Sequence, residues 1–192
     1  MPKPNHSAME FLLSRRSRPA KTLIAPAPSR EELEPILQAA ARSPDHGKLE
    51  PWRFIVLEKP ALERLADLAE TIGKRQGRVE EQCNKGRRYY DDGHLAVAVI
   101  EVQKPSETIP AKEQTYSAGA VCLAMLNAGL ASGWGANWLS GWPSHDREFI
   151  TEGLGLAENE SVAGLIFFGT ERITPPERPR PDLDTITTWV SE

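Results

Sequence analysis

Residues 117–131, with the sequence SAGAVCLAMLNAGLA, restrict the fold more than any other segment of the chain. Their composition predicts a helix whose every face is apolar or small, ended by the glycines at positions 129, 133 and 135. A helix without a polar face has to be covered on all sides. It therefore lies either at the centre of a domain or between two subunits.

Segments with helical and strand-like patterns alternate around this helix, which predicts a mixed α and β fold. Residues 9–15 indicate a short first helix. Ser29 and Glu32 have the spacing of a capping box before a second helix, inside which Pro35 either bends the helix or shifts its start. A third helix follows Pro60. Strands are predicted at residues 52–57, 95–102, 134–139 and 162–168, and Ser144 is expected to cap a short helix that Gly153 ends.

The length of 192 residues suits one domain with a sizeable core, so we expect residues 1–192 to form a single domain. The net charge of −4 gives no overall electrostatic case for a nucleic-acid or anionic-membrane partner. The longest stretch without polar side chains covers only residues 118–126, whereas a membrane span needs about 20 residues. The N-terminus also lacks the signal-peptide pattern, so a cytoplasmic location is expected.

The sequence lacks the usual marks of a metal site or a hydrolase. Its two cysteines, Cys83 and Cys122, have no paired spacing with each other or with histidine, so neither a disulfide framework nor a zinc site is supported. Cys122 is expected in the core, and Cys83, in a charged stretch, as an exposed thiol. No nucleophile elbow, zinc-protease motif or phosphate-binding loop occurs either.

Residues 74–92 interrupt the helical pattern and are strongly basic. Within them, residues 74–88 hold six basic and two acidic side chains, a local charge of +4. We expect a mobile insertion that acts as a lid and attracts the phosphates of a nucleotide.

The C-terminal residues 174–192 have the composition of an arm. Four prolines between positions 174 and 182 predict a stiff extended segment of roughly 28 Å, at about 3.1 Å per residue. The tip, residues 186–190, contains isoleucine, tryptophan and valine, which suits a strand at a sheet edge. The arm either lies on its own domain or, in the slightly favoured alternative, adds an edge strand to a second subunit.

Two clusters have side chains suited to ligand binding. Arg15, Arg16 and Ser17 offer two guanidinium groups and a hydroxyl for a phosphate or a polar heteroaromatic edge, although such a cluster is more often a solvated helix end. The second cluster, residues 42–46 with the sequence RSPDH, precedes Glu50-Pro51-Trp52 and otherwise indicates a helix end and a loop.

Four segments in this order resemble the flavin-dependent nitroreductase family, and in particular its short branch: residues 11–17 (FLLSRRS), residues 41–46 with 51–54 (ARSPDH, PWRF), residues 133–141 (GWGANWLSG) and residues 153–170. The resemblance extends from about residue 9 to the C-terminus. It implies an α+β three-layer sandwich with a central, mostly antiparallel sheet flanked by helices. It also implies an interlocked homodimer that binds FMN at its interface, with the arm around the partner.

The resemblance also implies roles for individual residues. One subunit would bind FMN through Arg15, Arg16 and Ser17, and the other would approach the same FMN with Arg42 and His46. The segment near the flavin phosphate and ribityl chain would be Trp138, Leu139 and Ser140. The stretch associated with NADH or NADPH would be Ala128, Gly129, Leu130, Ala131, Ser132 and Gly133.

The sequence departs from the family pattern at two places. Lys48-Leu49-Glu50 stands where larger members have an asparagine and a glutamine before Pro-Trp, and Leu139 stands where close relatives have an arginine. A basic residue of the 74–88 segment, or Arg15 or Arg16, would have to replace the lost phosphate contact. Trp138, Trp142, Tyr89 and Tyr90 are candidates for a wall that stacks on a ring.

The leading hypothesis is an FMN oxidoreductase that passes a hydride from NADH or NADPH to nitroaromatic or quinone-like acceptors by a ping-pong mechanism. No side chain is expected to act as a catalytic nucleophile and no metal is expected, because FMN itself carries the hydride. A flavin-binding carrier or sensor without efficient turnover is the alternative. A polyanion-binding module using residues 74–88 is the weakest hypothesis, since the whole chain is acidic.

Overall fold

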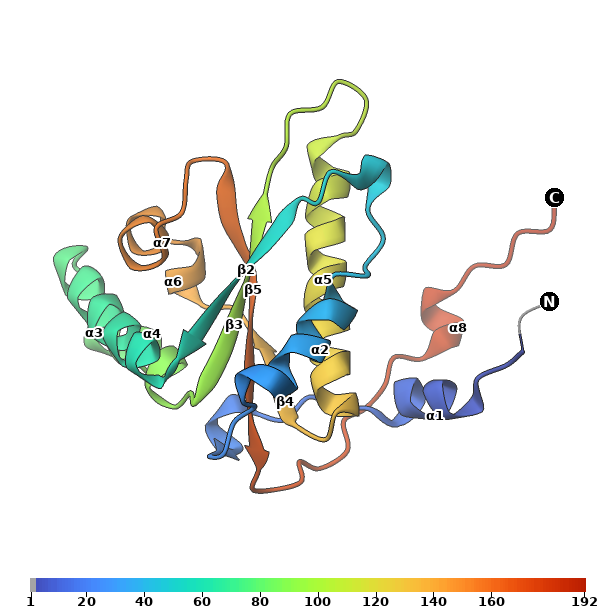
Figure 1. The fold of residues 1–192 in the computed structure, drawn as a ribbon, viewed down its shortest axis with the longest axis horizontal. Helices are drawn as coiled ribbons and strands as arrows, with labels where there is room; N and C mark the ends of the chain where they lie inside the picture. Colours follow the sequence, from blue (N-terminus) through green and yellow to red (C-terminus); the bar gives the residue numbers. More distant parts are fainter. Residues whose placement is uncertain (1–2) are drawn as a thin grey trace.

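The computed structural model describes residues 3–192 and shows a five-stranded sheet between two layers of helices (Figure 1). The strands pair in the order β1–β5–β3–β2, and β4 also pairs with β5; all of these pairings are antiparallel. The strands are β1 (Leu23–Ile24), β2 (Trp52–Glu58), β3 (Leu95–Val102), β4 (Gly135–Leu139) and β5 (Glu160–Glu171). This arrangement confirms the predicted α+β class and leaves one side of β2 as an edge of the sheet.

The helices flank the sheet on both faces. They are α1 (His6–Ser14), α2 (Arg30–Ala40), α3 (Lys59–Arg75), α4 (Glu80–Asp91), α5 (Ala111–Ala131), α6 (Trp142–His145), α7 (Arg147–Leu154) and α8 (Leu183–Ile186), with short 3₁₀ turns η1 (Ala20–Thr22) and η2 (His46–Lys48). α2 and α5 cover one face, and α3, α4, α6 and α7 cover the other (Figure 1).

The central strand β3 shows why its sequence is a continuous apolar run. Ala96, Ala98 and Ile100 point into the core beneath α3 and α7, whereas Val97 and Val99 point into the core beneath α2 and α5. Because both faces are covered, no position from Leu95 to Ile100 carries a polar side chain; the one polar residue of β3, Glu101, accepts a hydrogen bond from the Ser161 hydroxyl. β5 alternates between the two cores in the same way.

The second helix begins where the capping box predicts. The Ser29 hydroxyl accepts a hydrogen bond from the Glu32 amide, and the Glu32 carboxylate accepts one from the Ser29 amide. Pro35 lies inside α2 without shifting its start, because the helix already begins at Arg30. Leu33, Ile36 and Ala40 form the buried side.

The apolar helix α5 is longer than predicted and is not covered all round within one protomer. It begins at Ala111 rather than at residue 117. Leu123 is 46% exposed and Tyr116 is 62% exposed, while Val121, Cys122 and Met125 on the opposite side are fully buried. The prediction that the domain covers every face of this helix is therefore not met within one protomer, which leaves the face with Tyr116 and Leu123 exposed.

The prediction that residues 74–92 form a mobile insertion is wrong. Most of it forms α4, which packs against α3 with Cys83, Gly86 and Tyr90 buried. Cys83 is 2% exposed, so it is a core thiol rather than the exposed one expected from its charged neighbours. Gly86 allows this packing, since a Cβ atom there would lie 2.5 Å from the indole nitrogen of Trp142.

The predicted boundaries of the helix near residue 144 are also wrong. Asp146, rather than Ser144, caps α7, and its carboxylate accepts a hydrogen bond from the Phe149 amide at 3.0 Å. The helix ends at Gly155, whose φ of 67° is the left-handed conformation of a helix C-terminus. Gly153 is instead buried inside the helix.

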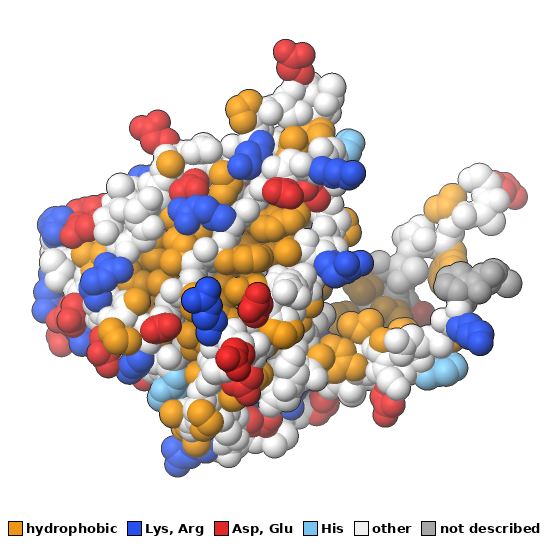
Figure 2. Space-filling model, in the orientation of Figure 1, with side chains coloured by type: hydrophobic (Ala, Val, Ile, Leu, Met, Phe, Trp, Pro, Cys, Tyr) orange, Lys and Arg blue, Asp and Glu red, His pale blue; other side chains and the backbone are white. Residues whose placement is uncertain are grey.

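Both ends of the chain project away from the sheet and its helices on the same side in Figure 1. α1 has no buried residue, and hydrophobic side chains show at the surface along it (Figure 2). In the C-terminal arm, Trp189 is 92% exposed and Val190 is 80% exposed. The expected strand at residues 186–190 is therefore not formed on the protomer's own sheet; α8 and an extended segment stand there instead.

Candidate functional site

Arg15 and Arg16 lie directly after α1, in a pocket of about 340 Å³. We call it the Arg15–Arg16 pocket; its other lining residues are Phe11, Ser14, Arg18, Leu130, Gly133, Trp134 and Glu171. Arg15 donates one hydrogen bond from Nη2 to the Ser17 hydroxyl at 3.0 Å. The structure thus brings together the predicted FMN segment and two residues of the predicted nucleotide segment.

The two guanidinium groups keep donors that no protein atom satisfies. Arg15 Nε and Arg16 Nη1 are buried and have no hydrogen-bond partner among the described residues. Burial lowers the pKa of Arg15, and the nearby charges of Arg180 and Arg18 lower it further. Buried donors without a hydrogen-bond partner are costly, and a phosphate oxygen is a suitable acceptor for such donors. The residues present therefore fit an anionic group.

Arg18 is neutralised and does not contribute a free charge. Its Nε donates to Glu171 Oε2 at 2.7 Å, and its Nη1 donates to the Arg16 carbonyl. Glu171 Oε1 stays buried without a partner. The nearest carboxylate to Arg16 comes from the arm, where Glu177 Oε1 lies 3.8 Å from Arg16 Nη1.

A second pocket, of about 550 Å³, lies on the other side of the same segment. We call it the Lys85–Arg88 pocket; it is also lined by Pro19, Ala20, Lys21, Glu81, Tyr89, Asp92, Asn137 and Leu139. The two pockets are neighbours, because Arg18 lines one and Pro19 lines the other. The Arg18 amide donates to the Ala136 carbonyl at 2.8 Å, which holds this segment beside β4.

The predicted flavin segment at the end of β4 divides between two environments. Leu139 lines the Lys85–Arg88 pocket, whereas Trp138 lies against Gly164, where a Cβ atom would come within 2.1 Å of the indole nitrogen. The Ser140 hydroxyl lies 2.7 Å from His145 Nε2. Leu139, at the position where the resemblance leads us to expect an arginine, thus lines the same pocket as Lys85 and Arg88.

Only part of the predicted aromatic wall is available to a ligand. Tyr89 lines the Lys85–Arg88 pocket, and Trp138 is 37% exposed. Tyr90 is 1% exposed in the core, and burial raises the pKa of its phenol. The Trp142 indole donates to the Gln82 carbonyl and lies beneath the Arg78 guanidinium. Tyr90 and Trp142 are therefore structural residues rather than part of a stacking wall.

Arg42 and His46 lie far from the Arg15–Arg16 pocket within one protomer. His46 Nδ1 lies 2.6 Å from Glu113 Oε2, in the first turn of α5, whereas Leu130 lines the pocket from the last turn. A helix of 21 residues is about 31 Å long. One chain by itself cannot bring both predicted groups to one small ligand.

The loop after His46 has a strained backbone that the sequence did not reveal. Gly47, Lys48 and Glu50 have φ values of 72°, 54° and 49°, in the left-handed region that residues other than glycine rarely adopt. The Asp45 carboxylate accepts a hydrogen bond from the Glu50 amide at 2.8 Å, which closes the loop. The strain coincides with the departure from the family pattern at residues 48–50.

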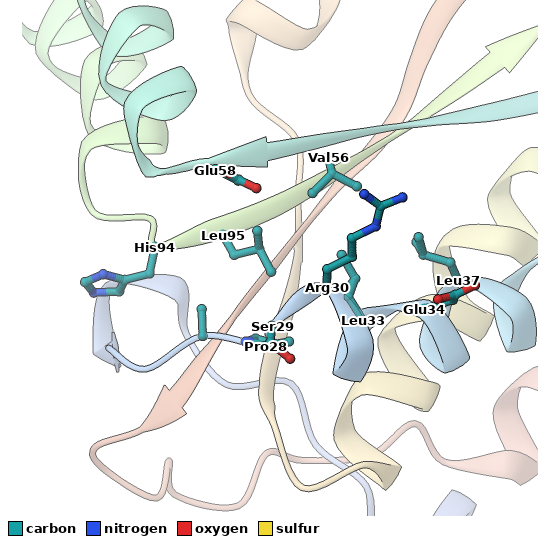
Figure 3. A pocket seen from close by; sticks show the side chains of 11 residues that line it. Pro28, Ser29, Arg30, Leu33, Glu34, Leu37, Val56, Glu58, His94 and Leu95 are labelled. Carbon is teal, nitrogen blue, oxygen red and sulfur yellow. The ribbon is translucent and has the colours of Figure 1, made fainter.

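A further cavity lies away from these two pockets. It measures about 590 Å³ and lies between α2 and the edge strand β2 (Figure 3). Leu33, Leu37, Val56 and Leu95 form its apolar wall, and the side chains of Arg30, Glu34, Glu58 and His94 surround it. It is an apolar groove beside a sheet edge, and none of the predicted site residues lines it.

Among residues 3–192, no group of three or more histidine, cysteine, aspartate or glutamate side chains has the arrangement of a metal site. The same part of the chain contains no helix of the length and apolar character that a membrane span requires.

Comparisons with known proteins agree with the resemblance in the sequence. The model of the nitroreductase family matches residues 12–170. A protein of Escherichia coli K12 named "Putative NAD(P)H nitroreductase YdjA" is 32% identical over 166 residues, which cover 86% of this chain and 89% of that protein. A nitroreductase-like protein from Bacillus cereus has a similar fold, with a TM-score of 0.80 over 99% of both chains at 19% identity. An FMN-dependent nitroreductase from Clostridium difficile R20291 superposes with a TM-score of 0.69 over 96% of this chain and 99% of that one, at 21% identity.

Proposed function

The chain belongs to the nitroreductase family, and from that premise we propose that it is an FMN-dependent oxidoreductase that passes a hydride from NADH or NADPH to nitroaromatic or quinone-like acceptors. Bound FMN supplies the redox chemistry by taking the hydride and passing it on in turn, which gives ping-pong kinetics. An acceptor nitro group that receives a hydride and a proton becomes a nitroso group and water. A cytoplasmic location stays a prediction.

The observation that carries this proposal is the pair of unsatisfied donors, Arg15 Nε and Arg16 Nη1. Together with Ser17 they would hold the FMN phosphate, since charge-assisted hydrogen bonds to phosphate satisfy both donors at once. Trp138, Leu139 and Ser140 would line the remainder of the cofactor site. The stretch from Ala128 to Gly133 would face the nicotinamide nucleotide, because Leu130 and Gly133 already line the same pocket.

We further propose that the site is completed by a second copy of the chain. The α5 face with Tyr116 and Leu123 is exposed and apolar, which suits an interface between protomers. A second α5 packed against it in the opposite direction would bring the partner's Arg42 and His46 to the Arg15–Arg16 pocket. This arrangement would resolve the separation of about 26 Å between Glu113 and Leu130 along α5.

The arm at residues 174–192 would hold the partner in the same assembly. Its tip exposes Ile186, Trp189 and Val190, and the groove beside β2 offers an apolar wall and an unpaired strand edge. Addition of an extended segment to such an edge satisfies its backbone groups and covers its apolar side chains. The dimer would thus bury surfaces that the protomer exposes at both places.

The experiment that tests the function is anaerobic stopped-flow mixing of the FMN-loaded protein with NADPH or NADH. Rapid bleaching of the flavin absorbance, followed by recovery on addition of a nitro compound, supports the oxidoreductase. A yellow protein that neither nucleotide bleaches would favour the alternative function, a flavin-binding carrier or sensor. The observation that supports this alternative is Leu139, at the position where the resemblance leads us to expect an arginine. A protein that cannot be loaded with FMN excludes both functions.

A further inference from the structure

The Arg15–Arg16 pocket contains an unsatisfied acceptor as well as unsatisfied donors. Glu171, the last residue of β5, lines this pocket, and its Oε1 atom is buried without a hydrogen-bond partner within residues 3–192. The donors Arg15 Nε and Arg16 Nη1 belong to the same lining. Leaving a buried acceptor unpaired costs free energy, as it does for a buried donor. A ligand that satisfies the whole pocket therefore has to supply a hydrogen-bond donor in addition to an anionic group.

Arg18 holds the Glu171 carboxylate beside Arg16. Its Nε donates to Glu171 Oε2 at 2.7 Å, and its Nη1 donates to the Arg16 carbonyl at 2.9 Å. Because one planar guanidinium group makes both bonds, the carboxylate and the Arg16 backbone lie within the span of that group. The side chains of Arg18 and Glu171 are only 22% and 28% exposed. The free oxygen of Glu171 is thus fixed next to the arginine pair.

The Glu171 carboxylate does not cancel the attraction of the pocket for a phosphate. Arg18 and Glu171 compensate each other, which leaves the two positive charges of Arg15 and Arg16. A phosphate monoester carries a charge of about −1.5 to −2 at pH 7, which these two cations match. A second anionic group would be repelled by the carboxylate. The group that suits Glu171 Oε1 is therefore an uncharged donor, such as a hydroxyl.

We infer that Glu171 is a specificity-determining residue of the cofactor site, whose Oε1 accepts a hydrogen bond from the ribityl 4′-hydroxyl of FMN. This inference rests on the proposed function, because it requires the FMN phosphate at Arg15 and Arg16. The 4′-hydroxyl is attached to the carbon next to the one that carries the phosphate. It is therefore the donor that enters with the phosphate into a pocket of only about 340 Å³, near the lower limit for ligand sites.

The test compares FMN with 4′-deoxy-FMN, which keeps the phosphate and lacks this hydroxyl. The Kd of each flavin for the full chain freed of its cofactor is measured by flavin fluorescence titration. A hydrogen bond to a charged group corresponds to a factor of about 10 to 150 in Kd. The wild type should therefore bind FMN more tightly than 4′-deoxy-FMN by a factor in this range.

Two substitutions at Glu171 should lower this ratio of the two Kd values by different amounts. Glu171→Gln keeps an oxygen that accepts from Arg18 and from the hydroxyl but removes the charge, so the ratio should fall to about 2 to 10. Glu171→Met removes the acceptor, so the ratio should fall to about one. Because both flavins carry the same phosphate, a change in the charge of the site alters both Kd values and cancels in the ratio.

Glu177→Gln is the matched control. The Glu177 carboxylate lies 3.8 Å from Arg16 Nη1, but its side chain is 70% exposed and does not line the pocket. The substitution removes the same charge as Glu171→Gln. It should change the Kd of FMN and of 4′-deoxy-FMN by equal factors and leave their ratio at the wild-type value.

Two results would overturn the inference while the proposed function stands. One is a wild-type ratio near one, and the other is a wild-type ratio that Glu171→Met leaves unchanged, since another group would then bind the hydroxyl. Bleaching of the FMN-loaded wild type by NADPH or NADH tests the proposed function separately. A protein that binds neither flavin contradicts the proposed function and this inference with it.

Discussion

Replacing Arg16 with methionine separates a ligand-binding role from a structural one. The Arg16 side chain is only 20% exposed, and among residues 3–192 its Nη1 atom has no hydrogen-bond partner; the Glu177 carboxylate lies 3.8 Å away. A buried donor without a partner costs about 1–3 kcal/mol. Methionine keeps an aliphatic stem and removes the donor. The free energy of unfolding of the FMN-free Arg16→Met protein should therefore equal that of the wild type or exceed it by up to about 3 kcal/mol.

The same substitution should weaken FMN binding. One charge-assisted hydrogen bond contributes about 1.5–3 kcal/mol, which corresponds to a Kd raised by about 10- to 150-fold. Fluorescence titration of FMN with the cofactor-free protein measures the Kd, and thermal unfolding followed by circular dichroism measures the Tm. Because 1 kcal/mol shifts the Tm of a chain of this size by about 2–4 °C, we expect an unchanged or higher Tm beside the weaker Kd.

Arg53→Met is the control, because the Arg53 guanidinium makes a bidentate ion pair with a carboxylate. Its Nε and Nη2 donate to the two carboxylate oxygens of Glu160 at 2.7 and 2.9 Å, and Glu160 is only 11% exposed. This variant should have a lower Tm and an unchanged FMN affinity. The reasoning is refuted if Arg16→Met lowers the Tm and leaves the Kd for FMN within about two-fold, since Arg16 would then be a structural residue.

The same Arg53–Glu160 pair lowers the pKa of Glu160 to about 2. The stability that this pair contributes is therefore fully present above the ordinary pKa of 4.5 and is lost as the pH falls toward 2. The free energy of unfolding, measured with urea between pH 6 and pH 3, should depend less on pH in Glu160→Gln than in the wild type. Deletion of residues 174–192 should weaken the dimer, and sedimentation velocity showing an equally stable dimer would mean that the arm stays on its own protomer. Gly164→Ala places a methyl group 2.1 Å from the Trp138 indole nitrogen, so it should displace that ring. We expect a changed tryptophan fluorescence spectrum and a lower affinity for FMN. An unchanged spectrum together with an unchanged FMN affinity would show that Trp138 does not belong to the cofactor site.

The fold could be predicted where the sequence pattern follows directly from burial. The continuous apolar run of β3 indicates a strand covered on both faces, and both faces are covered. The capping box at Ser29 and Glu32 depends only on residues three apart, so it forms in the chain as the spacing predicts. The capping box and the burial of both strand faces each depend on residues that are close together in the sequence, so both can be predicted from a short segment.

The errors arise where a side chain's partner is distant in the sequence. Residues 74–92 were expected to be mobile because their charges are unbalanced locally, yet Arg75 pairs with Glu148 and Arg78 with Asp146. Those carboxylates are supplied by α7 and by its N-cap residue, more than 50 residues away in the sequence. The same packing buries Cys83, although its neighbours along the chain are polar.

The candidate site shows the same limit. The Arg15–Arg16–Ser17 motif was visible as a cluster, but a cluster alone does not distinguish a solvated helix end from a binding pocket. The distinction depends on Leu130, Trp134 and Glu171, which surround the two arginines from elements more than 100 residues away in the sequence. The sequence gives no indication that Lys21 lines the Lys85–Arg88 pocket, because its place there depends on the position of η1 beside α4.

The length of α5 is the structural reason for proposing that two protomers form the site together. Its first turn holds Glu113 against His46, and its last turns hold Leu130 against the Arg15–Arg16 pocket, so at 1.5 Å per residue the helix keeps two sets of candidate ligands about 26 Å apart. A protomer that used both sets at one FMN would have to break this helix. In the proposed dimer, a twofold axis across the exposed face of α5 would bring the two sets together without breaking the helix, and it would form two equivalent sites. The apolar face that one chain exposes would then be the surface that completes the site.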